Sequence, residues 1–141
     1  MIILDTNVLS AMMRQAPDPP VIAWLDAQPA ESIWITTITL FEVRLGLALL
    51  PAGARRRALE RACDEVLTVD LEGRILDFDS DAARAAAALG AERQRRGRTV
   101  DVRDTQIAGI ALSRRARLAT RNSRDFSDLG AAVVNPWDEG G

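Results

Sequence analysis

Three acidic residues, Asp5, Glu42 and Asp104, are the side chains of this chain best suited to chemistry, and they lie far apart in the sequence. Carboxylate oxygens are the ligands that hard divalent cations such as Mg²⁺ and Mn²⁺ prefer. Two carboxylates about 4 Å apart repel by roughly 4 kcal/mol at an effective dielectric near 20, so a shared cluster should raise at least one pKa and attract a cation. We therefore expect a Mg²⁺ or Mn²⁺ site made of oxygen ligands, at which an acidified water can hydrolyse a phosphodiester.

Each of these acids also has a purely structural interpretation. Asp5 could cap the helix predicted to begin after it, and Glu42, on a mostly apolar helix face, could pair with an arginine in the core. Asp104 falls in the first turn of another predicted helix, where the helix dipole favours negative charge. Asp101, three residues earlier, suits the N-cap position of that helix better, and we assign the structural role to it.

A fourth polar region follows the apolar residues 118–120 and contains Asn122 and Asp125. The Asn122 side chain could donate its carbonyl oxygen to a metal or hold a water. Asp125 could reach the same pocket, but it could equally pair with Arg121. Both residues are candidates for the fourth ligand.

The elements that must position these residues alternate between strand and helix. Short apolar runs predict strands at residues 2–4, 33–35, 66–71, 118–120 and 132–134, and helical patterns separate most of them, which predicts a parallel α/β sheet. Asp5 directly follows the first strand, at the sheet edge where ligands bind in such folds. Between the second and third strands we expect two helices broken at residues 50–53, as a hairpin that leans away from the sheet. The alanine-rich helix expected at about residues 81–96 permits close approach by another helix.

The composition excludes several mechanisms. The chain has no His, no Lys and no Tyr, so Ser–His–Asp and Cys–His nucleophile systems and a Walker P-loop are excluded. Its one cysteine, Cys63, allows no internal disulfide and no cysteine-based zinc site. The net charge of -2 means that any attraction for nucleic acid must be local. The length suits one domain over residues 1–141, and because no apolar run approaches the roughly 18 residues that span a bilayer, we expect a soluble cytoplasmic protein.

The ordered set of motifs resembles PIN-domain nucleases, and among them the VapC-like and FitB-like toxins of bacterial type II toxin–antitoxin pairs. The resemblance is carried by residues 3–8 around Asp5, 39–46 around Glu42, 104–108 around Asp104, 119–122, and the closing Asn-Pro-Trp at 135–137. It implies an α/β, PIN-like three-layer domain, in which helices flank a five-stranded parallel sheet and a helical hairpin protrudes.

The resemblance also implies an activity, namely Mg²⁺- or Mn²⁺-dependent endonucleolytic cleavage of RNA. It assigns metal ligation to Asp5, Glu42 and Asp104, and orientation of the attacking water to Thr6. Many relatives have Asp where this chain has Asn122, so the site carries one charge fewer unless Asp125 substitutes.

The partners that the resemblance implies are an RNA substrate, a second copy of the chain in a homodimer, and a cognate antitoxin. The antitoxin's C-terminal segment would cover the active-site groove while its N-terminal part binds operator DNA, so this chain would meet the operator only through the antitoxin. The candidate contacts with these protein partners are Leu47, Leu49, Leu50, Leu59 and Trp24. Core packing is the alternative for each of them. The candidate RNA contacts are all arginines. Four of them have few acids beside them and could instead form a solvated helix end: Arg93, Arg95, Arg96 and Arg98. The other two, Arg103 and Arg121, lie near the predicted site.

Two other functions compete with this prediction. An Asp after a first strand is also where phosphoacceptor receivers and haloacid-dehalogenase-type phosphatases place their nucleophile. Receivers use a Lys that this chain lacks, and the phosphatases favour a second Asp where Asn7 stands here. The other alternative is a catalytically weakened PIN scaffold that acts as an RNA-binding or antitoxin-binding autoregulatory partner, against which the intact Asp5, Glu42 and Asp104 argue.

Overall fold

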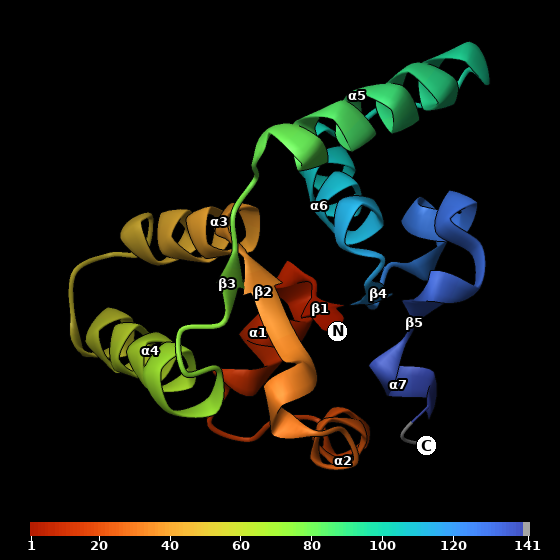
Figure 1. Cartoon of the computed structure of the whole chain (residues 1–141). Helices are drawn as coiled ribbons and strands as arrows, with labels where there is room; N and C mark the ends of the chain where they lie inside the picture. Colours follow the sequence, from red (N-terminus) through yellow and green to blue (C-terminus); the bar gives the residue numbers. More distant parts are fainter. Residues whose placement is uncertain (140–141) are drawn as a thin grey trace.

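A five-stranded parallel sheet forms the centre of the computed structural model, which describes residues 1–139 (Figure 1). The strand order is β3-β2-β1-β4-β5, and every neighbouring pair is parallel. The predicted α/β fold is confirmed. The strands are β1 (Ile2–Leu4), β2 (Ile33–Thr36), β3 (Ile75–Leu76), β4 (Arg117–Ala119) and β5 (Val133–Val134).

Strand β1 lies in the middle of the sheet, with Ile2 paired to Ile33 of β2 on one side and to Arg117 of β4 on the other. The chain adds β2 and β3 on one side of β1 and later adds β4 and β5 on the opposite side. The carboxyl end of β1 is therefore the point where the strand order switches, which is where open parallel sheets bind ligands.

Helices fill both faces of the sheet because strand side chains alternate in direction. Leu4 packs into a core with residues of α1, α2, α3 and α4, whereas Ile3 packs into a second core with α5 and α6. The three layers that the resemblance implies are thus present. The helical elements are α1 (Thr6–Met12), α2 (Pro19–Asp26), the short 3-10 turn η1 (Ala30–Ser32), α3 (Thr37–Ala48), α4 (Ala54–Glu65), η2 (Val66–Asp70), α5 (Ser80–Arg95), α6 (Val102–Arg114), η3 (Ser123–Ala132) and α7 (Pro136–Glu139).

The helical hairpin and the alanine-rich helix were both predicted, and both are present. Helices α3 and α4 are broken at residues 49–53, and the loop that joins them extends away from the sheet in Figure 1. Helix α5 packs against α6 so closely that a Cβ atom added at Gly109 would lie 2.6 Å from the carbonyl oxygen of Ala82. Small residues at this contact allow the two backbones to approach.

The strand predicted at residues 66–71 is wrong. Residues Val66–Asp70 form η2, a π-helical turn that extends α4, and the third strand is the shorter Ile75–Leu76. Cys63, Val66 and Leu71 are buried in the core at helical spacing, so packing overrides the preference of the branched residues for a strand. Within residues 1–139, no helix is long and apolar enough to cross a membrane.

Candidate active site

Asp5 sits at the carboxyl end of β1 and is 4% exposed. Its Oδ1 accepts a hydrogen bond from the backbone N–H of Thr6 at 2.8 Å and so caps α1, while its Oδ2 accepts one from the Thr120 hydroxyl at 2.7 Å. Burial raises the pKa of Asp5; the bonds from Thr120 and Thr6 lower it, and repulsion from Glu42 and Asp125 raises it further. Asp5 is therefore both a helix cap and a member of a group of interacting acids.

Glu42 approaches this point from helix α3, which begins at the N-cap Thr36 directly after β2. The Thr6 hydroxyl donates a hydrogen bond to Glu42 Oε1 at 2.9 Å. Arg103 Nη1 lies 3.6 Å from Glu42 Oε2, and the Arg103 side chain is 47% exposed. A long pair with a half-exposed arginine contributes little stability, and within residues 1–139 Glu42 has no ion pair with a buried arginine.

Asp104 lies in the first turn of α6 and is half-buried. The N-cap of α6 is Asp101, whose Oδ1 accepts the backbone N–H of Asp104 at 2.9 Å, as predicted. Burial is the largest cause that raises the pKa of Asp104 to about 7, and repulsion from Asp101, Asp5, Asp125 and Glu42 adds to it.

The predicted acids thus lie near enough to act on one another at the switch point of the sheet. Among residues 1–139, no three acidic or cysteine side chains are gathered tightly enough to ligate one ion. The available donors are carboxylates and hydroxyls, which suit a hard cation that keeps several of its waters, as Mg²⁺ does. The residues present fit such an ion by their chemistry, and metal ligation by Asp5, Glu42 and Asp104 stays a prediction.

The two candidates for the fourth position are placed differently. Asp125, in η3, raises the pKa of both Asp5 and Asp104 by its charge, and it lines with Asp104 a cavity of about 240 Å³. Asn122 is exposed, and its backbone N–H donates to the Thr120 hydroxyl at 3.0 Å. The guanidinium of Arg121 lies over the Trp137 ring at 4.8 Å. Asp125 is therefore the better placed candidate.

The arginines predicted to contact RNA separate into three groups. Arg95 and Arg96 are exposed and both pair with Glu92, which is the arrangement of a solvated helix end. Arg103 lies beside the acidic group through its pair with Glu42. The backbone N–H of Arg121 donates to Asn7 Oδ1 at 3.1 Å, and its guanidinium lies over Trp137.

Arg93 and Arg98 form the third group. Arg93 is 3% exposed and its guanidinium is bound to Asp128, so we withdraw it as an RNA contact. Arg98 also pairs with Asp128, at 3.1 Å, and stays partly exposed. Asp128 and Phe126, which pack around the Arg93 guanidinium, belong to η3 and lie more than thirty residues away in the sequence, so the residues next to Arg93 in the chain do not predict its burial.

Thr120 is the residue of the site that sequence reasoning missed. Its side chain is fully buried, and its hydroxyl joins Asp5 to the backbone of Asn122. One sequence feature could have placed Thr120 in the site, namely its position directly after a strand that could pair with β1. The carboxyl ends of neighbouring parallel strands lie at the same edge of the sheet.

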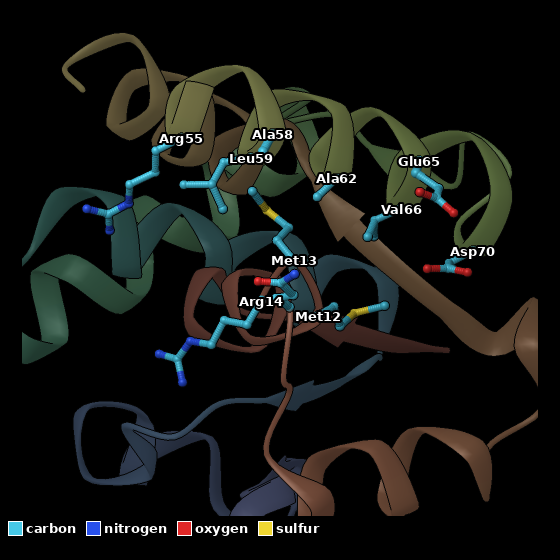
Figure 2. Close-up of a pocket in the computed structure, with 11 residues that line it drawn as sticks. Met12, Met13, Arg14, Arg55, Ala58, Leu59, Ala62, Glu65, Val66 and Asp70 are labelled. Carbon is cyan, nitrogen blue, oxygen red and sulfur yellow. The ribbon is translucent and has the colours of Figure 1, made fainter. Parts of the chain in front are cut away.

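A separate groove of about 720 Å³ runs between the end of α1 and helix α4 (Figure 2). Its apolar lining is formed by Met12, Met13, Leu59, Ala62 and Val66. Figure 2 shows Arg14 and Arg55 towards one end of the groove and Glu65 and Asp70 towards the other.

The five candidate partner contacts do not share one environment. Trp24 and Leu47 are buried in the core, and Leu50 is partly buried against it, so core packing accounts for these three. Leu59, also packed on the core, lines the groove, and Leu49 is 76% exposed.

Comparison with known proteins extends over nearly the whole chain. The PIN domain model matches residues 2–132. VapC ribonuclease Y4jK from Sinorhizobium fredii is 39% identical over 138 residues, which cover 98% of this chain and 99% of the relative. Toxin FitB from Neisseria gonorrhoeae is 35% identical over 139 residues, covering 99% of this chain and 100% of the relative. The structure of FitAB bound to an IR36 DNA fragment matches with a TM-score of 0.87 and 36% identity over 97% of this chain and 96% of that chain.

Proposed function

Because the chain belongs to the PIN domain family, we propose that it is the toxin of a type II toxin–antitoxin pair and acts as a Mg²⁺- or Mn²⁺-dependent endoribonuclease. The predicted resemblance to VapC-like and FitB-like toxins is confirmed by relatives with those names and by structural neighbours solved as toxin–antitoxin complexes. The names of several relatives describe ribonucleases.

The observation that carries this proposal is the mutual repulsion of carboxyl groups at the switch point of the sheet. Burial is the largest cause that raises the pKa of Asp104, and repulsion adds to it from its N-cap Asp101 and from Asp5, Asp125 and Glu42, which lie in three other segments of the chain. A structural role would favour neutralising these acids with arginines, whereas within residues 1–139 neither Asp5 nor Asp104 forms an ion pair, and Arg93 and Arg98, which line the same cavity as Asp104, are paired with Asp128. Such an arrangement favours binding of a divalent cation.

In the proposed site, Asp5, Glu42 and Asp104 hold the ion and Asp125 supplies the fourth carboxylate. When bound, the cation supplies Lewis acidity that acidifies water and neutralises charge on the phosphodiester. Asp5 is fixed for this task by its bonds from Thr6 and Thr120.

Thr6 and Arg103 have roles in substrate positioning. The Thr6 hydroxyl donates its hydrogen to Glu42, so the lone pairs of its oxygen are free to accept a hydrogen bond from the attacking water and orient it. Arg103 is exposed and only loosely paired with Glu42, so its guanidinium can move to a phosphate of the RNA.

Cleavage of a panel of structured RNAs tests the proposal. The purified protein, freed of any bound inhibitor, should cut RNA in Mg²⁺ or Mn²⁺ but not in a chelator, and Asp5→Asn should reduce cleavage at least about 100-fold because one ligand charge is lost. Asp81→Asn is the matched control, because Asp81 is exposed on α5 and, within residues 1–139, pairs only with Arg84. Equal cleavage by the wild type and Asp5→Asn would place the activity elsewhere.

The same experiment separates the nuclease from the weakened scaffold. A scaffold would bind the RNA panel with measurable affinity but leave it intact in both metals. That result would replace the enzyme proposal by the autoregulatory one.

We also propose that the groove of Figure 2 binds a segment of the cognate antitoxin. The chain would then contact operator DNA only through the antitoxin. FitAB and the VapBC2 pair of Rickettsia felis were solved with DNA, which supports an assembly of this kind. An apolar lining with opposite charges at its two ends suits an amphipathic helix with its acidic residues near Arg14 and Arg55 and its basic residues near Glu65 and Asp70.

This proposed binding site is tested by measuring the affinity of the chain for the protein encoded by the adjoining upstream reading frame. Leu59→Arg should weaken binding at least about tenfold in calorimetry, since a charge would enter the apolar lining. Leu112→Arg, at an exposed position of α6 outside the groove, should bind like the wild type. Unchanged affinity of Leu59→Arg would place the antitoxin elsewhere.

A further inference from the structure

Arg93 is an arginine in the last turn of α5 whose side chain is almost completely buried. Burying a guanidinium is costly unless its charge and its donors are satisfied. The groups that satisfy it therefore show which parts of the fold it holds together.

The partners of Arg93 come from two segments outside α5. Its Nε and Nη2 donate to the two carboxylate oxygens of Asp128 at 2.7 and 2.9 Å, in a bidentate arrangement. Nη1 donates to the Thr105 hydroxyl at 3.2 Å, and Nη2 donates to the backbone carbonyl of Asp125 at 3.3 Å. The guanidinium also lies 5.9 Å from the centre of the Phe126 ring.

These contacts adjoin two of the acids of the candidate active site. Thr105 directly follows Asp104 on α6, and the Asp125 carbonyl belongs to the residue that is the better placed fourth acid. Both acids line the cavity of about 240 Å³, and Arg93 forms part of its wall. One planar side chain thus joins α5, the first turn of α6 and the η3 segment.

We propose that Arg93, held by Asp128, is a positioning residue that keeps the Asp104 and Asp125 carboxylates at one cavity, an inference that rests on the proposed metal-dependent nuclease. A buried ion pair adds little net stability compared with apolar packing, but a bidentate guanidinium fixes the direction of the groups that it binds. Lysine keeps the charge at this position but cannot reach Asp128, Thr105 and Asp125 with one planar fork.

The test is Mn²⁺ binding by calorimetry to the purified chain, with the folded fraction measured by circular dichroism. Arg93→Lys should bind Mn²⁺ about 10- to 100-fold more weakly than the wild type, the range seen when groups behind metal ligands are removed. RNA cleavage by the variant should show a lower kcat at an unchanged KM. Arg84→Lys, an exposed arginine on the same helix that has no part in the proposed site, is the matched control and should match the wild type in all three measurements.

Asp128→Asn is the second variant, in case Arg93→Lys does not fold, and it should show the same loss of Mn²⁺ affinity. In the Asp125→Asn background, Arg93→Lys should cause a smaller further loss than it does alone, because part of its effect passes through Asp125. A merely structural arginine would lower the melting temperature without this coupling.

Three results would overturn the inference. Folded Arg93→Lys with wild-type Mn²⁺ affinity would show that the contacts do not position the acids. A raised KM for RNA at unchanged Mn²⁺ affinity would make Arg93 a substrate contact. A wild-type protein that neither binds Mn²⁺ nor cleaves RNA would overturn the proposed function and this inference with it, whereas the first two results would overturn this inference alone.

Discussion

At the scale of single residues, Asp104 links stability to pH. Burial and the repulsion of four other acids raise the pKa of Asp104 to about 7, whereas an unfolded chain releases this proton near pH 4. The folded protein therefore binds more protons than the unfolded chain between these values. It follows that the contribution of Asp104 to stability falls as the pH rises from about 4 to about 7, and is constant above that.

Asp104→Asn should remove this dependence in the absence of metal. Above pH 7 the variant should be more stable than the wild type by on the order of 1 kcal/mol, a discounted value because the carboxyl is only half-buried and water screens it. Near pH 4 the two proteins should be equally stable, and Mn²⁺ should bind the variant more weakly. Urea unfolding with a chelator at pH 4.5 and pH 8 measures the difference, and an equal loss of stability at both values would make Asp104 a structural residue.

Thr120 is the second residue with a specific expectation. Its buried hydroxyl donates to Asp5 Oδ2 and accepts the backbone N–H of Asn122. Thr120→Val should cost about 1–3 kcal/mol of unfolding free energy, because the buried Oδ2 of Asp5 loses its donor and the Asn122 N–H loses its acceptor. Mn²⁺ affinity should fall as well, and Thr120→Ser should restore both; a serine variant as impaired as the valine variant would assign the effect to the methyl group.

At the scale of secondary-structure elements, the contact between α5 and α6 sets the position of Asp104. A Cβ atom at Gly109 would lie 2.6 Å from both the Ala82 oxygen and the Ala86 Cβ, so the helices would have to separate. Because α6 carries Asp104 in its first turn, a shift at this contact reaches the site.

Gly109→Ala should therefore destabilise the fold by about 1–3 kcal/mol and weaken Mn²⁺ binding. Gly90→Ala on α5 is the matched control. Its new Cβ would meet only the Thr105 methyl at an ordinary 3.5 Å, and the better helix propensity of alanine should stabilise the protein by up to about 1 kcal/mol. Thermal unfolding of the two variants measures the contrast, and equal melting temperatures would show that α5 and α6 can separate without cost.

At the scale of the whole molecule, helix α3 exposes apolar side chains, of which Phe41 has the Arg103 guanidinium 5.4 Å from the centre of its ring. Phe41 is 55% exposed and Leu49 is 76% exposed, and with the half-buried Leu45 they recur every four residues on one face. We propose that a second copy of the chain covers this stripe in the homodimer that the family resemblance implies, because exposed apolar stripes of this kind mark protein contacts.

Leu49→Arg should convert the dimer into a monomer while leaving the melting temperature of the fold within a few degrees of the wild type. Light scattering coupled to gel filtration measures the mass. Val69→Arg changes a 63% exposed residue on η2, a different part of the surface, and should stay dimeric. A wild-type protein that is monomeric at all concentrations, or a dimeric Leu49→Arg, would contradict the assignment of the stripe.

Short stretches of sequence were enough to predict most of the strands, several helices and two helix caps. Apolar runs and their spacing predicted four of the five strands, the α3–α4 break and the alanine-rich helix, because such periodicity reflects which side chains face the core. Asp5 after β1 and Asp101 before α6 were placed correctly, since caps depend on residues only a few positions apart.

Only the tertiary structure decided the remaining features, because they depend on partners distant in the chain. Residues 66–70 are helical rather than extended because the core receives Val66 and Leu71 at helical spacing. Arg93 is buried because Asp128 reaches it from thirty-five residues away, and Thr120 binds Asp5 across 115 residues. Sequence patterns over a few residues do not predict such contacts, because they form only when the helices pack against the sheet.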